Sequence, residues 1–247
     1  MKFYKENQLD EYNSKGWVKI ENLISETEVK FIKKEIKSFF KNKAKGYKGR
    51  NINFADNSKD INKINSFHRL SDIKWIKKLS KKNKFKKTAD FFLNTKSKFI
   101  QSELFAKPAK VGLPSPVHQD NFYWCLKDNK ALTIWIALDK VNSLNGGICY
   151  YEKSHKKGLM KHTPSFAKGS SQTIQNKDLL RRFKKIVPKL KPGDALVHHC
   201  LIAHGSKKNL STKSREGITF QYKSNNSKTD FTRKKKYLRD LHSQIKK

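Results

Sequence analysis

Residues 131–138 read Ala-Leu-Thr-Ile-Trp-Ile-Ala-Leu, and this run of β-forming residues decides the fold class. Alternate side chains of a strand point to opposite faces. Thr133 and Trp135 therefore share one face, which suits a polar pocket. The other face is aliphatic, which suits packing between sheets; it consists of Ile134, Ile136 and Leu138.

Four more short runs of apolar or alternating residues flank this strand, separated by Pro, Gly, Asn and Asp. They cover residues 98–107, 146–151, 194–203 and 216–223. Regularly spaced short strands predict an antiparallel sandwich or barrel. We therefore expect a mainly β fold with added helices.

The N-terminal third is mostly helical in pattern. A short strand is predicted at 16–20, followed by a helix that begins after Ser25 and runs to about residue 40. Glu28 stands three residues after Ser25, the spacing of a capping box. Residues 41–70 read as a long irregular loop, of a kind that often forms a lid.

Two further helices are predicted, at residues 72–94 and 231–245. The second has Phe231, Leu238, Leu241 and Ile245 at helical spacing, which predicts a surface helix that docks one face. We expect one domain over residues 1–247, divided into three parts. These are helical support at 1–97, a β core at 98–223 and a basic C-terminal helix at 224–247.

A candidate metal site begins at His118-Gln119-Asp120, which follows a turn rich in Pro and Gly. In extended chain, residues two apart point to the same side, so His118 and Asp120 can reach one metal. His204, near the end of a later strand, supplies a third candidate ligand. Two histidines and one carboxylate form the facial triad of non-haem Fe(II) oxygenases, which leaves coordination positions open.

Arg215 lies eleven residues beyond His204, at the start of another predicted strand. A 2-oxo acid that chelates iron leaves its far carboxylate free. The planar guanidinium of arginine is a natural partner for that carboxylate through two charge-assisted hydrogen bonds. The pattern therefore favours 2-oxoglutarate as cosubstrate.

The ordered motifs resemble the phytanoyl-CoA dioxygenase family of Fe(II)- and 2-oxoglutarate-dependent oxygenases, from the N-terminal helix through Tyr222. The segments that carry the resemblance are His118–Asn121, Leu132–Asp139, Asn145-Gly146-Gly147, Ser154–Gly158, and Gly193-Asp194 leading to His204-Gly205-Ser206 and Arg215. The resemblance implies a double-stranded β-helix, or jelly roll, with N-terminal helices packed on one sheet.

The resemblance also implies roles for individual residues. Iron would be held by His118, Asp120 and His204, and 2-oxoglutarate by Arg215, with Gln119, Trp135 and Ser206 as further contacts. With O₂, such enzymes hydroxylate a C–H bond and release succinate and CO₂, without a general base. Halogenating relatives carry a small residue in place of the aspartate, so Asp120 favours hydroxylation.

The substrate is expected to be a small organic molecule, which could be anionic. Candidate substrate contacts are Asn121, Tyr123 and His162, with His68 and Phe122 beside them. Lys107 and Gln101 could point into the barrel. Of His198 and His199, the one on the His204 face is expected to be a hydrogen-bonded core histidine, with support of the metal site as the alternative.

The charge pattern leaves two other functions open. The formal net charge is +35, but 49 of the 56 basic residues are lysine and they are scattered along the chain. Arginine is the better residue for bidentate phosphate contacts, so the scatter favours compositional drift over a nucleic-acid surface. A nucleic-acid-directed oxygenase and a non-catalytic metal-binding jelly roll are the alternatives.

Cysteine usage and hydropathy indicate the compartment. The three cysteines, Cys125, Cys149 and Cys200, are widely spaced and form no C-x-x-C pair, which disfavours a disulfide framework. No stretch approaches the length of a membrane span, and the N-terminus lacks the pattern of a signal peptide. We therefore expect a cytoplasmic protein. The sequence does not predict the oligomeric state.

Overall fold

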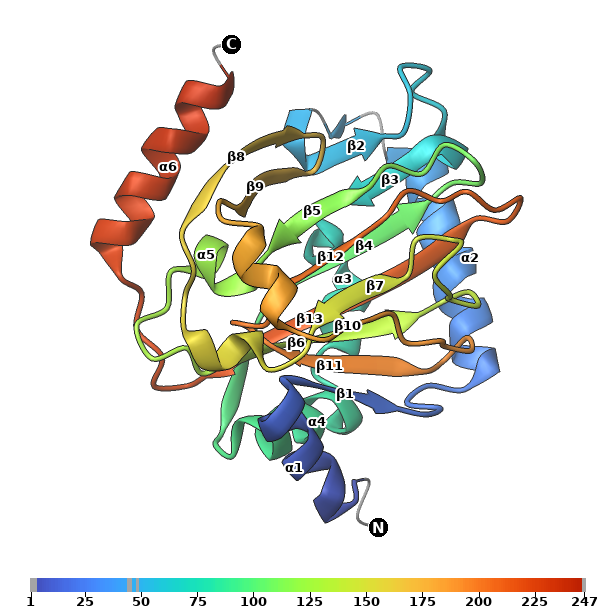
Figure 1. Ribbon diagram of the computed structural model, residues 1–247. Helices are drawn as coiled ribbons and strands as arrows, with labels where there is room; N and C mark the ends of the chain where they lie inside the picture. The colour runs from blue at the N-terminus through green and yellow to red at the C-terminus, as the bar shows by residue number, and fades with distance from the viewer. Residues whose placement is uncertain (1–3, 44–45, 48, 246–247) are drawn as a thin grey trace.

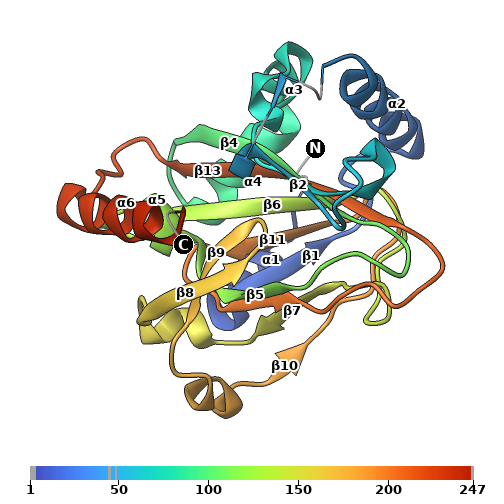
Figure 2. The same ribbon diagram turned by 90° about the horizontal axis from the view of Figure 1, so that it is seen from above.

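The computed structural model describes residues 4–43, 46–47 and 49–245. A layer of helices, a large sheet and a smaller sheet lie one behind another, as the view from above shows (Figure 2). The strands of both sheets pair antiparallel. The predicted jelly-roll core is thereby confirmed.

The larger sheet has seven strands in the order β1-β11-β6-β13-β4-β3-β2 (Figure 1). Their bounds are β1 (Trp17–Ile20), β11 (Ala195–His199), β6 (Ala131–Ala137), β13 (Arg215–Ser224), β4 (Ser97–Lys107), β3 (Ile64–Phe67) and β2 (Ile52–Phe54). The smaller sheet has the order β10-β7-β12-β5. Its strands are β10 (Lys185–Ile186), β7 (Ile148–Tyr151), β12 (His204–Ser206) and β5 (Ser115–His118). A separate hairpin pairs β8 (His162–Ala167) with β9 (Ser170–Ile174).

The helices of the N-terminal part are α1 (Glu6–Lys15), α2 (Glu26–Lys43), α3 (Lys74–Leu79) and α4 (Asn83–Leu93). The predicted capping box starts α2. The backbone N–H of Ser25 donates to Glu28 Oε2 at 2.9 Å, and the N–H of Glu28 donates to Ser25 Oγ at 3.2 Å. The predicted helix at 72–94 is two helices, α3 and α4, and α1 was not predicted.

The two faces of β6 divide the core. Its aliphatic residues, Ile134 and Ile136, are fully buried in one cluster with residues of α2, α3 and α4. Trp135 lies in a second cluster with Tyr150 of the smaller sheet. The expectation that the aliphatic face packs between sheets was therefore wrong: it packs against the helices, because these cover the outer face of the larger sheet. The face with Thr133 and Trp135 looks into the space between the sheets.

The predicted irregular loop at 41–70 is more regular than expected, since β2 and β3 extend the larger sheet beyond β4. The helix predicted at 231–245 is confirmed as α6 (Phe231–Ile245). Its docking face matches the prediction only in part, since Leu241 lines the pocket described below and the Ile245 side chain lies outside the described residues. Phe231 and Leu238 are exposed, whereas Tyr237 packs against Phe122 and Tyr123 of α5 (Asp120–Trp124). Among the described helices, none has the length and hydropathy needed to cross a membrane.

Candidate metal and cosubstrate site

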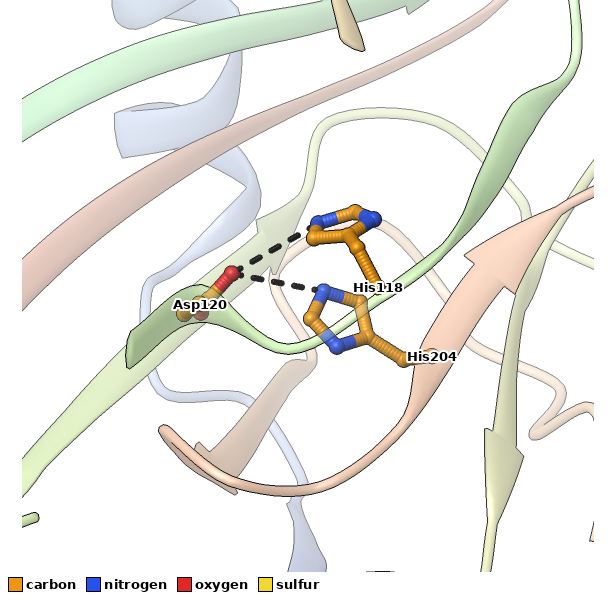
Figure 3. A group of neighbouring side chains, drawn as sticks. All are labelled: His118, Asp120 and His204. Atoms are coloured by element: carbon orange, nitrogen blue, oxygen red, sulfur yellow. Dashed lines mark ion pairs between the residues drawn. The ribbon is translucent and has the colours of Figure 1, made fainter. Parts of the chain in front are cut away.

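The three predicted ligands meet because β12 pairs with β5. His204 opposes His118 in that pairing, and Asp120 begins α5 two residues after His118. Nε2 of each histidine lies 3.6 Å from Asp120 Oδ1, and one ligand atom from each residue lies within 4.8 Å of the others. Figure 3 shows both rings and the carboxylate turned toward one another. The predicted triad is therefore one compact group.

Both imidazole rings are held in the orientation that a metal requires. Nδ1 of His118 donates to the carbonyl oxygen of Pro116 at 2.8 Å, and Nδ1 of His204 donates to that of Ile202 at 3.0 Å. With Nδ1 protonated, the lone pair of each Nε2 points at the common centre. Two imidazole nitrogens and one carboxylate oxygen suit Fe(II).

The second oxygen of Asp120 is held by two hydrogen bonds. Thr133 Oγ1 donates to Oδ2 at 2.7 Å, and Nε2 of His198 donates to it at 3.2 Å. The hydroxyl of Tyr150 completes the chain by donating to Nδ1 of His198 at 2.7 Å. Burial by itself raises the pKa of Asp120, but His204, His118 and His198 together hold that pKa well below its usual range. The carboxylate is therefore ionised and oriented for a cation.

His198 is thus a buried, hydrogen-bonded histidine, as expected, and its bond to Asp120 also agrees with the alternative, support of the candidate metal site. The sequence alternation also predicted that His198 and His204 lie on one face of one strand, and this prediction was wrong. The strand β11 ends at His199, and His204 belongs to the other sheet. His198 reaches Asp120 across the space between the sheets. His199 faces away, beside Tyr12 and His155.

Arg215 begins β13 and is 1% exposed. Its Nη1 donates to the carbonyl oxygen of Phe105 at 3.2 Å, and its Nη2 donates to that of Gly146. Gly146 adopts φ +77°, and a Cβ there would lie 2.6 Å from the Lys107 side chain. Within the described residues, Arg215 Nε is buried with no hydrogen-bond partner. A buried guanidinium with an unused donor fits an anion such as the far carboxylate of 2-oxoglutarate.

Trp135 and Lys107 flank Arg215. The Arg215 guanidinium lies 5.4 Å from the Trp135 ring, and a Cβ at Gly217 would lie 2.0 Å from that ring, so only glycine leaves room. Lys107 is the register partner of Arg215 and is 3% exposed. Burial and the positive charge of Arg215 lower the pKa of Lys107 to about 6. Sequence reasoning left the direction of Lys107 open; the β4–β13 register decides it.

One pocket of about 790 Å³ joins these groups. It is lined by the three ligands together with Arg215, Trp135, Ser206 and Tyr123, and by Lys107 and Gln101. Further lining comes from residues 51–68, from residues 166–171 and from α6. The metal centre and the arginine therefore share one cavity with room for a cosubstrate and a small substrate.

Three predicted contacts lie behind the pocket wall. The Gln119 amide donates to the carbonyl oxygens of Gly158 and Leu201, and its Oε1 accepts from the N–H of Met160. Asn121 bonds across its own loop to Leu126. In the described part of the chain, neither residue lines the pocket, nor does His162. The expected ligand contacts of all three find no support in this arrangement.

His162 instead holds the backbone at Gln119, between the two candidate ligands His118 and Asp120. Its Nε2 accepts from the backbone N–H of Gln119 at 3.1 Å, and its Nδ1 donates to the carbonyl oxygen of Met160 at 2.9 Å. Burial lowers the pKa of His162 to about 4, so the ring is neutral at pH 7 and can accept that bond. Among the residues proposed for substrate contact, Tyr123 does line the pocket; its hydroxyl donates to the carbonyl oxygen of Gln172 at 3.3 Å.

Comparison with known proteins decides the family. The phytanoyl-CoA dioxygenase (PhyH) family model matches residues 12–217. The chain belongs to the phytanoyl-CoA dioxygenase family. A phytanoyl-CoA dioxygenase of Arabidopsis thaliana is 25% identical over 86% of both chains. A 1-deoxypentalenic acid 11-beta-hydroxylase of Streptomyces exfoliatus is 31% identical over 43% of this chain and 38% of its own.

Solved structures agree with this fold. EctD from S. alaskensis with bound Fe has a TM-score of 0.74 at 20% identity, covering 92% of this chain and 80% of its own. The carbocyclase SnoK from nogalamycin biosynthesis, described as non-heme and alpha ketoglutarate dependent, has a TM-score of 0.73 at 19% identity, covering 92% and 86%. As a member of this family, the protein is a non-haem iron, 2-oxoglutarate-dependent dioxygenase.

Proposed function

We propose that this phytanoyl-CoA dioxygenase family member binds Fe(II) through His118, Asp120 and His204 and hydroxylates a C–H bond of a small organic molecule. It consumes 2-oxoglutarate and O₂ and releases succinate and CO₂. The observation that carries the proposal is the approach of two pre-oriented Nε2 atoms to Asp120 Oδ1 at 3.6 Å each. The presence of Asp120 favours hydroxylation over halogenation.

The cosubstrate is assigned to the Arg215 end of the pocket. Arg215 and Lys107 are both buried there. Arg215 supplies positive charge for the far carboxylate, and Lys107 can take up a proton beside it. Trp135 and Ser206 line the same pocket from the two sheets. Iron supplies the oxidative chemistry when bound. The protein's own residues hold the ligands, fix the cosubstrate in a dry pocket and orient the substrate.

Hydroxylation is the outcome that relatives support most directly. One relative is named as an 11-beta-hydroxylase, and EctD has been solved with 2-oxoglutarate and 5-hydroxyectoine. Both names refer to small molecules, so we propose a small-molecule substrate for this protein. A nucleic-acid substrate is the second candidate. Three free buried cysteines suit a reducing compartment, and we expect the cytoplasm.

The proposal is tested by turnover without substrate. The purified protein is incubated with Fe(II), ascorbate, 2-oxoglutarate and O₂, and succinate is measured by NMR. Slow succinate formation is expected from the wild type and none above background from His118→Ala. Equal succinate formation by the two proteins would show that this site is not the iron centre.

A further inference from the structure

The pocket wall contains a second unused polar atom, far from the cosubstrate end. Gln221 is 4% exposed and lines the pocket, and its Oε1 is buried without a hydrogen-bond partner among the described residues. It lies on β13 six residues after Arg215, so the two side chains share a face about 20 Å apart along the strand. Its register partner is Thr133, which donates to Asp120. Gln221 therefore lies near the metal ligands, on the side away from Arg215.

The neighbour of Gln221 fixes which atom of its amide is free. Gln221 Nε2 donates to Glu103 Oε2 at 2.7 Å. Because an ionised carboxylate only accepts hydrogen bonds, the amide nitrogen must face Glu103, and Oε1 must be the free atom. Glu103 Oε1 pairs with Nδ1 of His68 at 2.6 Å, and the Glu103 side chain is 11% exposed. Gln221, Glu103 and His68 form what we call the Glu103 cluster.

The free lone pairs of Glu103 and Gln221 can only accept further hydrogen bonds. Each carboxylate oxygen has a second lone pair beyond the bond already made, and Gln221 adds an unpaired carbonyl oxygen. Glu103 also contributes a negative charge. A protonated amine has three donors, no acceptor and a positive charge, so it matches this set better than a hydroxyl, which must also find a donor.

The wall of the pocket mixes polar and apolar side chains. Its amide and hydroxyl groups come from Asn53, Asn65, Ser66, Ser170 and Ser171, and its apolar side chains include Ile100, Phe105 and Phe166. The wall therefore suits a small molecule that carries polar groups on a carbon skeleton.

We propose that the substrate is a compact polar amine whose protonated amino group binds the Glu103 cluster, which places its carbon skeleton beside the iron ligands. This inference rests on the proposed function, since it assigns the substrate of that same site. It makes Glu103 and Gln221 residues that determine specificity.

The test uses matched probes on the anaerobic Fe(II)–2-oxoglutarate complex. Alanine is compared with lactate, phenylalanine with phenyllactate, and putrescine with butanediol, each titrated while the visible charge-transfer band is recorded. At least one amine is expected to perturb the band and to bind at least about tenfold more tightly than its hydroxyl partner, the size of one charge-assisted hydrogen bond.

Glu103→Gln and Gln221→Met should each weaken the binding of that amine at least about tenfold. Glu26→Gln, at the exposed start of α2, should leave its binding unchanged. Two variants are used so that, if one of them does not fold, the other still tests the inference. The inference is overturned if no amine perturbs the band, if hydroxyl partners bind as well, or if both variants bind the amine like wild type. If the wild type gives no band before any probe is added, it is the proposed function that fails.

Discussion

The two ends of the pocket are built differently. At the iron end, the candidate ligands and the residues that hold them lie on paired strands of both sheets or directly follow them. The polar atoms of the ligands that do not face the metal centre form hydrogen bonds within the protein. Nδ1 of His118 and of His204, for example, is bonded to backbone carbonyl oxygens. At the outer end, the wall comes from residues 51–68, from the β8–β9 turn and from α6, and Phe166 there is 71% exposed. Strands β5 and β12 of the smaller sheet position the candidate iron ligands, whereas the outer wall is formed by strands at one edge of the larger sheet, a turn and a helix.

The largest effect is expected from loss of a ligand at the iron end. His204→Ala removes one of three metal ligands, and we expect the iron affinity to fall more than about 100-fold, because changes outside the ligand set alone cost 10- to 100-fold. Anaerobic calorimetry with Fe(II) measures this. His242→Ala, an exposed histidine on α6, is the control. Near-normal iron affinity in His204→Ala would remove His204 from the ligand set.

Arg215→Ala should separate the cosubstrate from the iron. We expect iron to bind normally and 2-oxoglutarate to bind at least about 30-fold more weakly, since losing one partner of a buried charge pair costs about 2–5 kcal/mol. Arg181→Ala is the matched control, because the Arg181 side chain is 85% exposed. An unchanged 2-oxoglutarate affinity in Arg215→Ala would place the cosubstrate elsewhere in the pocket.

His198→Leu tests the support of Asp120 from β11. Without the hydrogen bond to Asp120 Oδ2, iron affinity should fall about 10- to 100-fold, and His198→Gln, which can still donate, should recover part of the loss. A purely structural role would instead lower the thermal stability of both variants without this difference in iron affinity.

Lys107 gives the cosubstrate end a dependence on pH. Its pKa of about 6 leaves the free amine mostly neutral at pH 7.5. A bound carboxylate favours the charged form and raises that pKa, so binding of 2-oxoglutarate should take up a proton. Affinity should then fall as pH rises above 6. Calorimetry in buffers of different ionisation enthalpy detects the proton, and Lys107→Met should abolish the uptake; persistence of the uptake would assign it to another group.

The smallest effect is expected from the outer wall. Phe166→Ala should leave the binding constants of iron and 2-oxoglutarate within about twofold of wild type. A substitution at a side chain that is 71% exposed changes the free energy of unfolding by about 0.5 kcal/mol or less, too little to displace the metal ligands. The same two calorimetric titrations measure it. A large loss of 2-oxoglutarate binding would mean that the two ends of the pocket are coupled.

The sequence predicted the metal-ligand and cosubstrate residues far better than the rest of the pocket wall. His118, Asp120, His204 and Arg215 stand in motifs with fixed spacing, and the structure brings them to one pocket. The short strands β5 and β12, which bring the histidines opposite each other, were missed, because three or four residues carry too little periodicity. The sequence alternation therefore misplaced His204 on the same strand as His198.

The rest of the pocket wall depends on which strands pair, and in which register. Glu103 and Gln221 meet only because β4 lies beside β13, and His68 reaches them because β3 extends the same sheet. Lys107 faces Arg215 for the same reason. His162 had no local signal for its bond to the Gln119 amide, since that bond joins the start of β8 to the residue after β5. Such contacts follow from tertiary pairing and cannot be derived from local patterns.

The most direct test is an anaerobic titration of the metal-free protein with Fe(II) and then with 2-oxoglutarate, recorded in the visible range. The account predicts a weak metal-to-ligand charge-transfer band in the wild type, no band in His118→Ala, and a band in Arg215→Ala only at much higher 2-oxoglutarate concentration. A folded wild-type protein that binds Fe(II) but shows no band with saturating 2-oxoglutarate would contradict it.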